Sequence, residues 1–385
     1  MTEIDGLAPT RAVPAARVWF PPEDREWILN EIDACLESGQ LTLGPLGARL
    51  EQEFASVAGT RHAVAVNSGT AALEVILRSL QETGRPVTGA EVLVPANTFF
   101  ATAAAVIHAG AIPRFVDCDP STMAIDVDSL RRSIGPKTVG VVIVHIGGLV
   151  TPAIDDIAAI CRSAGLWLVE DAAHAHGSAR GSKAAGSFGA AASFSFYPTK
   201  VIAGAEGGMI TTDDEALATT ARVLRDQGKA SFGANHHILL GSNWRLGEPQ
   251  AAIILSQLRR LSEFIDTRQR VAAHYDRAMA ELGLQTIVVP PDTRHNYYKY
   301  VVRLPRDVDR ATTKARMRDE HRVSLSGEVY DTPLHRQPVF ASYADRELPG
   351  AEETCARHIC LPISAVMTDE DALQVTDALG RVLSS

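Results

Sequence analysis

The stretch Ser193–Gly208, SFSFYPTKVIAGAEGG, begins as a strand and then changes character abruptly. From Ser193 to Tyr197, small polar and aromatic residues alternate, which is typical of a half-buried strand. Pro198 lacks a backbone N–H donor and ends the strand. Lys200 follows two residues later, and the rest of the stretch is rich in glycine. The pattern predicts a core strand that leads a single lysine into a flexible, glycine-lined loop.

Strand and helix patterns alternate on both sides of this stretch. Short strands rich in valine and isoleucine are separated by helical segments such as 70–80. This alternation predicts an α/β fold whose mostly parallel sheet is covered by helices on both faces. Together with the strand at Ser193, the predicted strands are 62–69, 91–98, 112–119, 138–148, 165–173 and 207–214.

The chain has 385 residues, and this length predicts more than one domain. Residues 1–21 are rich in proline and alanine, and we expect an irregular N-terminal arm there. We expect residues 22–259 to form the large domain and residues 260–385 a smaller α+β domain. Segment 248–282 has the periodicity of one long helix, straight or bent, which would connect the two domains.

Composition excludes several classes of function. The net charge of −9 argues against binding to nucleic acid, because phosphate contacts need Lys and Arg. We expect neither a membrane span nor a signal peptide, since no apolar run has the required length. The five cysteines are odd in number and scattered, so we expect reduced thiols in a cytoplasmic protein.

Polar and aromatic residues lie where predicted strands end, which is the edge at which open α/β sheets bind ligands. Ser68, Gly69 and Thr70 form a strand-to-helix turn whose free amides suit a phosphate, although an ordinary N-cap has the same sequence. Phe99 follows the next strand, where it either stacks on a planar ring or packs in the core.

Two ionisable residues complete this pattern. Asp171 ends a buried strand, where it either holds a protonated ring nitrogen or caps a turn. Lys200 is either a surface lysine or, if desolvation lowers its pKa, a nucleophilic amine. His174 and His176 raise the rival hypothesis of a metal site with Asp171, but no further cluster completes the ligand set, and we expect no metal.

Taken in order, these features match the needs of pyridoxal 5′-phosphate (PLP). That cofactor requires an amine for its aldehyde, a carboxylate for its ring nitrogen, a stacking face and a phosphate site. Lys200, Asp171, Phe99 and the turn at Gly69 supply one of each. We therefore expect a PLP site.

The motifs resemble those of the DegT/DnrJ/EryC1/StrS family of PLP-dependent sugar aminotransferases. The resemblance runs from about Pro21 to the C-terminus and implies the aspartate aminotransferase fold, fold type I, with a mostly parallel seven-stranded sheet and a smaller C-terminal α+β domain. The motifs that carry it are TLGP (42–45), NSGTAAL (67–73), PANTFFATAAAV (95–106), VEDAAHAHG (169–177), GSFGAAASFSFYPTK (186–200), EGG (206–208) and SNWRLGEPQAAI (242–253).

The resemblance also implies a role for each matching residue. Lys200 would bind the cofactor covalently and transfer the proton, Asp171 would pair with the pyridine nitrogen, and Phe99 would stack on the ring. His174 stands where the family often has Gln and would contact the ring hydroxyl. The other implied positions are Ser68, Gly69, Thr70 and Ser195 for the phosphate, Asn243 for the phosphate of the neighbouring subunit, and Tyr298 and His335 for the substrate.

The implied reaction is ping-pong transamination from glutamate or glutamine to a nucleotide-linked keto-deoxysugar, in a homodimer with shared active sites. His174, the HIGG run at 145–148, and AEGG in place of GEGG or GDGG depart from the family pattern. These departures leave a keto-cyclitol or other non-nucleotide acceptor open. A non-catalytic PLP-binding regulatory module is a further alternative, against which the Asp171–Lys200 pair argues. No strand is followed by the GxGxxG turn of a NAD enzyme.

Overall fold

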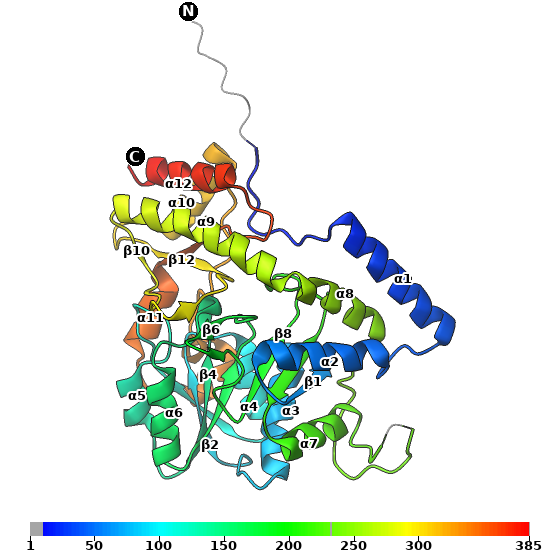
Figure 1. Ribbon diagram of the computed structural model, residues 1–385. Helices are drawn as coiled ribbons and strands as arrows, with labels where there is room; N and C mark the ends of the chain where they lie inside the picture. Colours follow the sequence, from blue (N-terminus) through cyan, green and yellow to red (C-terminus); the bar gives the residue numbers. More distant parts are fainter. Residues whose placement is uncertain (1–10, 232, 385) are drawn as a thin grey trace, which may run out of the picture.

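The alternating strands and helices build one seven-stranded sheet in the computed structural model, which describes residues 11–231 and 233–384 (Figure 1). Within these residues β9 alone runs antiparallel to its neighbours in that sheet, so the predicted mostly parallel sheet is confirmed. The strand order is β1 (His62–Val66), β9 (Gly208–Thr212), β8 (Ala191–Ser195), β5 (Trp167–Asp171), β4 (Thr138–Val144), β2 (Glu91–Pro95) and β3 (Ile112–Val116).

Helices cover both faces of this sheet because alternate strand residues are apolar on each side. In β4, Val141 and Ile143 pack into one hydrophobic cluster and Val142 packs into the other. The first cluster is covered by α2 (Pro45–Ala58), α5 (Val127–Ser133), α6 (Ile154–Ser163) and α8 (Glu248–Arg259), and the second by α3 (Gly69–Glu82), α4 (Phe100–His108) and α7 (Glu215–Arg225).

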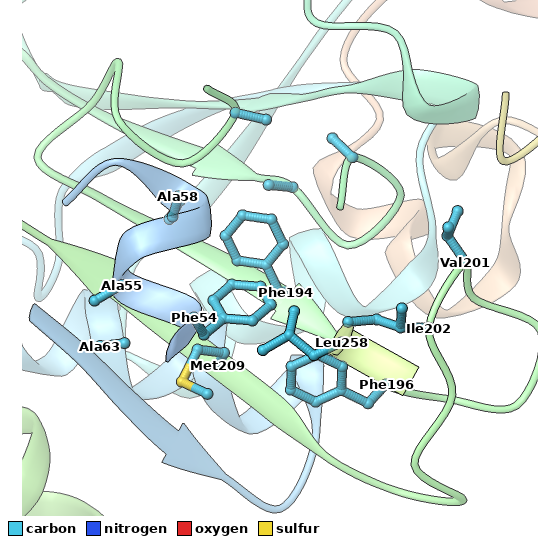
Figure 2. Close-up of a cluster of buried hydrophobic side chains, with 14 of the residues drawn as sticks. Phe54, Ala55, Ala58, Ala63, Phe194, Phe196, Val201, Ile202, Met209 and Leu258 are labelled. Carbon is cyan, nitrogen blue, oxygen red and sulfur yellow. The ribbon is translucent and has the colours of Figure 1, made fainter. Parts of the chain in front are cut away.

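The segment after Lys200 differs from the sequence prediction. Val201 and Ile202 are buried in the first cluster together with Phe54 of α2 (Figure 2). Gly204 lies so close to α8 that a Cβ there would be 2.2 Å from Cγ1 of Ile254. The prediction of a flexible loop is therefore wrong for residues 201–204, where glycine permits close packing.

The second sheet belongs to the C-terminal part of the chain. It contains β10 (Gln285–Thr286), β12 (Tyr300–Arg303) and β13 (His358–Leu361), all antiparallel. Helices α9 (Leu261–Glu281), α10 (Arg310–His321) and α12 (Asp369–Leu383) pack with it around one hydrophobic cluster (Figure 1).

The long helix predicted over 248–282 is two helices, since the chain turns between α8 and α9 at Arg260 (φ −97°, ψ 3°). The domain boundaries at residues 21/22 and 259/260 stay predictions. The remaining elements are α1 (Pro22–Ser38), α11 (Pro349–Arg357), the 3-10 helices Ile146–Gly148, Leu334–Arg336 and Pro338–Tyr343, and a small sheet of β6 (Ala179–Arg180), β7 (Lys183–Ala184) and β11 (Thr293–Arg294).

Part of the expected N-terminal arm, residues 1–10, lies outside the described residues. In the rest of the arm, Val13 is buried and forms a bridge with Val323 of the C-terminal part. All five cysteines are free and buried. No helix within the described ranges is long and apolar enough to cross a membrane.

Candidate functional site

A cavity of about 320 Å³ lies where β5 and β8 end. Lys200 and Asp171 both line it, as expected from parallel strands whose carboxyl ends meet at one edge. Most of the residues predicted for the cofactor and the substrate line the same cavity: Ser68, Gly69, Thr70, Phe99, Asp171, His174, Ser195, Lys200 and Tyr298.

Lys200 is held by a turn that follows the end of β8. Its backbone N–H donates to the carbonyl of Tyr197 (2.9 Å), and its Nζ lies 5.0 Å from the ring centroid of Tyr298. Burial lowers the pKa of Lys200 to about 8, with Asp171 acting in the opposite direction and Lys299 in the same direction. The amine can therefore lose its proton near neutral pH.

Asp171 is the last residue of β5 and is buried. Its Oδ2 accepts a hydrogen bond from Oγ1 of Thr102 (2.8 Å), and its Oδ1 accepts one from the N–H of Ala173 (3.2 Å). Burial raises the pKa of Asp171, whereas these hydrogen bonds oppose the rise because they favour the carboxylate. The carboxylate is thus positioned by two donors.

The N-terminus of α3 forms one wall of the cavity. Ser68 is the N-cap, and its Oγ accepts from the N–H of Ala71 (3.1 Å), so the ordinary capping interpretation holds for its side chain. The N–H groups of Gly69 and Thr70 precede the first intrahelical bond and are available to an anion. A Cβ on Gly69 would lie 2.8 Å from Cβ of Ser195, so glycine is required for this close approach.

His174 lies against two tyrosines. Its ring centroid is 4.3 Å from that of Tyr298, and its Nε2 is 3.4 Å from Oη of Tyr330. Its Nδ1 is buried without a partner among the described residues, and burial holds the pKa of His174 well below the usual value. Tyr330 also stacks on Phe99, with ring centroids 6.3 Å apart. A neutral histidine therefore faces the cavity beside aromatic rings.

Behind Asp171, a buried hydrogen bond joins β5 to the residue that follows β4. Nε2 of His145 lies 2.9 Å from Oε2 of Glu170, and both side chains are fully buried. Glu170 also accepts from the N–H groups of Gly186, Phe188 and Gly189. This carboxylate therefore fixes the loop before β8 and is not available to a ligand.

Two predicted site residues lie outside the cavity. Asn243 is exposed, and its carbonyl accepts from Nδ2 of Asn67 (3.2 Å). His335 is buried, and its Nε2 lies 2.8 Å from Oε1 of Glu352. Neither residue lines the space beside Lys200. Their roles toward a neighbouring subunit and toward substrate stay predictions.

The rival metal hypothesis needs a third ligand beside Asp171 and the two histidines. Across residues 11–231 and 233–384, no group of three or more His, Cys, Asp or Glu side chains could hold a metal ion. Both ring nitrogens of His176 are buried without a partner in these ranges, and burial lowers the pKa of His176 to about 3.

Several residues that line or support the cavity have no role that the sequence alone predicts. Thr102 is one of them, and its hydroxyl lies 3.0 Å from that of Thr98. In the sequence, the only signal for this pair is the spacing of four residues between two threonines of the PANTFFATAAAV motif. Lys299 is another such residue, and its signal in the sequence is its position next to Tyr298 in the YYKY run. Glu206 lies in the EGG motif at 206–208, which supported the family resemblance but assigned this residue no role. No local pattern distinguishes Glu328 and Tyr330, which also line the cavity.

The chain is similar to known proteins over most of its length. A family model described as the DegT/DnrJ/EryC1/StrS aminotransferase family matches residues 22–380. The chain is 36% identical over 372 residues to the spore coat polysaccharide biosynthesis protein SpsC of Bacillus subtilis, covering 92% of this chain and 94% of SpsC. It is 35% identical to the UDP-N-acetyl-3-dehydro-alpha-D-glucosamine 3-aminotransferase of Acidithiobacillus ferrooxidans, covering 95% and 96%.

Among solved structures, the chain is similar to DesV of S. venezuelae, whose crystal structure holds a ketimine intermediate. The TM-score is 0.89 and the sequence identity 33%, and the match covers 97% of this chain and 98% of DesV.

Proposed function

The chain belongs to the DegT/DnrJ/EryC1/StrS aminotransferase family, and on this premise we propose that it transfers an amino group from glutamate or glutamine to a nucleotide-linked keto-deoxysugar. Enzymes of this family use PLP. The observation that carries the proposal is the cavity that brings Lys200, Asp171 and the N-terminus of α3 together.

The residues of the cavity fit PLP. The free N–H groups of Gly69 and Thr70 suit its phosphate, and the buried carboxylate of Asp171 suits its ring nitrogen. His174 has a buried Nδ1 without a partner in the described ranges, which a polar group on the ring would satisfy. When bound, PLP supplies an aldehyde that takes up the amino group and a ring that accepts the electrons of a broken C–H bond.

In this proposal Lys200 moves the proton. Its Nζ takes the proton from the donor's Cα and later returns a proton to the acceptor carbon. The lowered pKa of about 8 supports this role, because a general acid/base works best when its pKa lies near the working pH. Tyr298, whose ring faces Nζ at 5.0 Å, would limit where the amine can move.

In this proposal the carboxylate of Asp171 faces the ring nitrogen of PLP. Thr102 and the N–H of Ala173 each donate to one carboxylate oxygen, which fixes the carboxylate's orientation. A buried carboxylate so oriented holds a proton on a nearby ring nitrogen, since the opposite charge stabilises the protonated form.

The acceptor proposal is supported by the named activity of the A. ferrooxidans relative, which acts on a UDP-linked keto-sugar. We further propose a homodimer with shared active sites. Exposed apolar side chains lie on the loop before Asn243: Ile238 is 53% and Leu240 84% exposed. A second copy would cover this apolar loop, and Asn243 would then reach the second copy's site.

The first test asks which lysine binds PLP. Purified protein with added PLP is reduced with borohydride, digested and mapped by mass spectrometry. We expect the label on Lys200 and no covalent label in Lys200→Ala. Lys299 lines the same cavity and is the matched control, because Lys299→Ala should still be labelled at Lys200. A label on Lys299 in the wild-type protein would refute the assignment.

The second test identifies the acceptor. UDP-, GDP- and dTDP-linked keto-sugars and a set of keto-cyclitols are each incubated with glutamate, and the amine products are detected by mass. We expect amination of a nucleotide-linked sugar. Amination of keto-cyclitols alone would overturn the acceptor class and leave the transamination chemistry intact.

A further inference from the structure

Lys299 is a second lysine at the cavity. It directly precedes β12, and its backbone N–H donates to the carbonyl of Gly147 (3.0 Å). Its Nζ donates to the carbonyl of Gly327 (3.0 Å) and lies 5.4 Å from the ring centroid of Tyr298. Two contacts thus orient the ammonium group at the edge of the site, while the side chain is only half-buried.

The charge of Lys299 is not neutralised by an ion pair. Within the described chain, no carboxylate oxygen lies within 4.0 Å of its Nζ. Glu328, which also lines the cavity, instead bonds to Nζ of Lys314 (2.7 Å) and lies 4.0 Å from Nε of Arg310. An ammonium has three N–H donors, and Gly327 uses one, so Lys299 has donors left for a ligand.

The other charged groups of the cavity leave a single position for an anionic substrate group. Asp171, Glu206 and Glu328 are acidic and repel a carboxylate. Of the two lysines that line the cavity in the described ranges, Lys200 is committed to the cofactor under the proposed function. Lys299 is then the remaining cation.

Glutamate and glutamine both carry a carboxylate on the carbon that reacts. When such a group enters a partly desolvated cavity, it needs a cationic or strong hydrogen-bonding partner. We propose that the ammonium of Lys299 binds the α-carboxylate of the amino donor, and that of the 2-oxo acid formed from it. This inference rests on the proposed function and assigns its donor subsite.

The position of Lys299 next to Tyr298 supports the assignment. The ring of Tyr298 is 5.0 Å from Nζ of Lys200 and 5.4 Å from Nζ of Lys299. Both lysines therefore lie against one ring, and a donor held by Lys299 would occupy the cavity that Lys200 also lines. Burial lowers the pKa of Lys299, with Cys360 and Glu328 opposing it, and a bound carboxylate would stabilise the charged form.

The test uses the full-length protein loaded with PLP and a non-reacting probe. Glutarate, which has two carboxylates and no amine, is titrated while the cofactor absorbance and calorimetric heat are followed. We expect Lys299→Met to weaken glutarate binding roughly 10- to 100-fold, the range for loss of a charge-assisted hydrogen bond. Lys299→Arg, which keeps the charge, should recover most of the affinity.

Lys137→Met is the matched control. It removes an equal charge from an exposed side chain that does not line the cavity, so it should bind glutarate as the wild type does. With glutamate, single-turnover kinetics of Lys299→Met should show a raised half-saturation concentration and a smaller change in the limiting rate. A purely structural role through Gly327 would instead change thermal unfolding and leave glutarate binding intact.

Three results would overturn the inference: unchanged glutarate affinity in Lys299→Met, an equal loss in Lys137→Met, or, when UDP is titrated in the same way, a loss confined to the binding of UDP. The last would assign Lys299 to the diphosphate of the acceptor. These outcomes are separate from failure of the proposed function, which borohydride mapping of Lys200 detects by itself.

Discussion

Replacing Thr102 by valine removes one hydroxyl and keeps the shape of the side chain. Thr102 is fully buried, and its Oγ1 donates to Oδ2 of Asp171 at 2.8 Å. A hydrogen bond to a charged group contributes about 1.5–3 kcal/mol. If that energy keeps the carboxylate of Asp171 ionised and oriented, its loss should lower kcat/KM roughly 10- to 150-fold, at about 1.4 kcal/mol for each factor of ten.

The direction in which the pKa of Asp171 changes predicts how the loss of kcat/KM in Thr102→Val depends on pH. Burial raises the pKa of Asp171, and the hydrogen bond from Thr102 lowers it by favouring the ionised form. Thr102→Val removes the lowering contribution, so the pKa of Asp171 rises and the acidic limb of the kcat/KM profile moves to higher pH. The loss of activity should be greatest at low pH and smaller at alkaline pH.

The assay measures kcat/KM against pH at saturating PLP for wild type, Thr102→Val and Thr102→Ser. The serine variant keeps the hydroxyl and should stay close to wild type. Thermal unfolding of each variant shows whether the fold is retained. An unchanged rate and an unchanged acidic limb in a folded Thr102→Val protein would show that the hydroxyl does not act on Asp171.

Three further outcomes are expected. Asp171→Asn should fold and yet lose roughly 100-fold or more in turnover, because the fixed charge is gone; near-normal turnover would disprove its role. Ala205→Gly should raise the free energy of unfolding by about 0.5–1 kcal/mol in a denaturant titration, because Ala205 has a φ of 67° that glycine adopts without strain. Mixing Lys200→Ala chains with inactive Asn243→Ala chains should restore up to about half of the wild-type activity per heterodimer, and verified heterodimers that stay inactive would place Asn243 in its own chain's site.

The sequence predicts well those parts of the site that depend on strand ends. Asp171 and Lys200 are separated in the chain, but Asp171 ends one recognisable buried strand and Lys200 follows another. Parallel strands place such ends at one edge, so their proximity followed from the pattern. The same reasoning located Gly69 at the start of α3. The family resemblance then agreed with the sheet that the structure contains.

Other parts depend on packing between elements, which periodicity does not encode. Thr102 reaches Asp171 from α4, a helix that packs against α3, β2 and β3. Tyr330 enters the cavity from a segment without regular structure. Gly204 and its neighbours resembled a flexible loop, since glycine permits both mobility and close contact. The closeness of Ile254 to Gly204 shows that this glycine serves close contact, and that closeness can be seen only in the three-dimensional structure.

The antiparallel strand β9 has a consequence for the order of folding during synthesis. Within the central sheet β1 pairs with β9 alone, and β9 is made long after β1 has left the ribosome. Gly208 of β9 lies against Ser68, where a Cβ would be 2.2 Å from the serine carbonyl oxygen. The turn at the start of α3, which we propose binds the cofactor phosphate, therefore acquires its wall only when β9 inserts. Because such distant pairings form late, a nascent chain that ends before β9 cannot yet retain the cofactor.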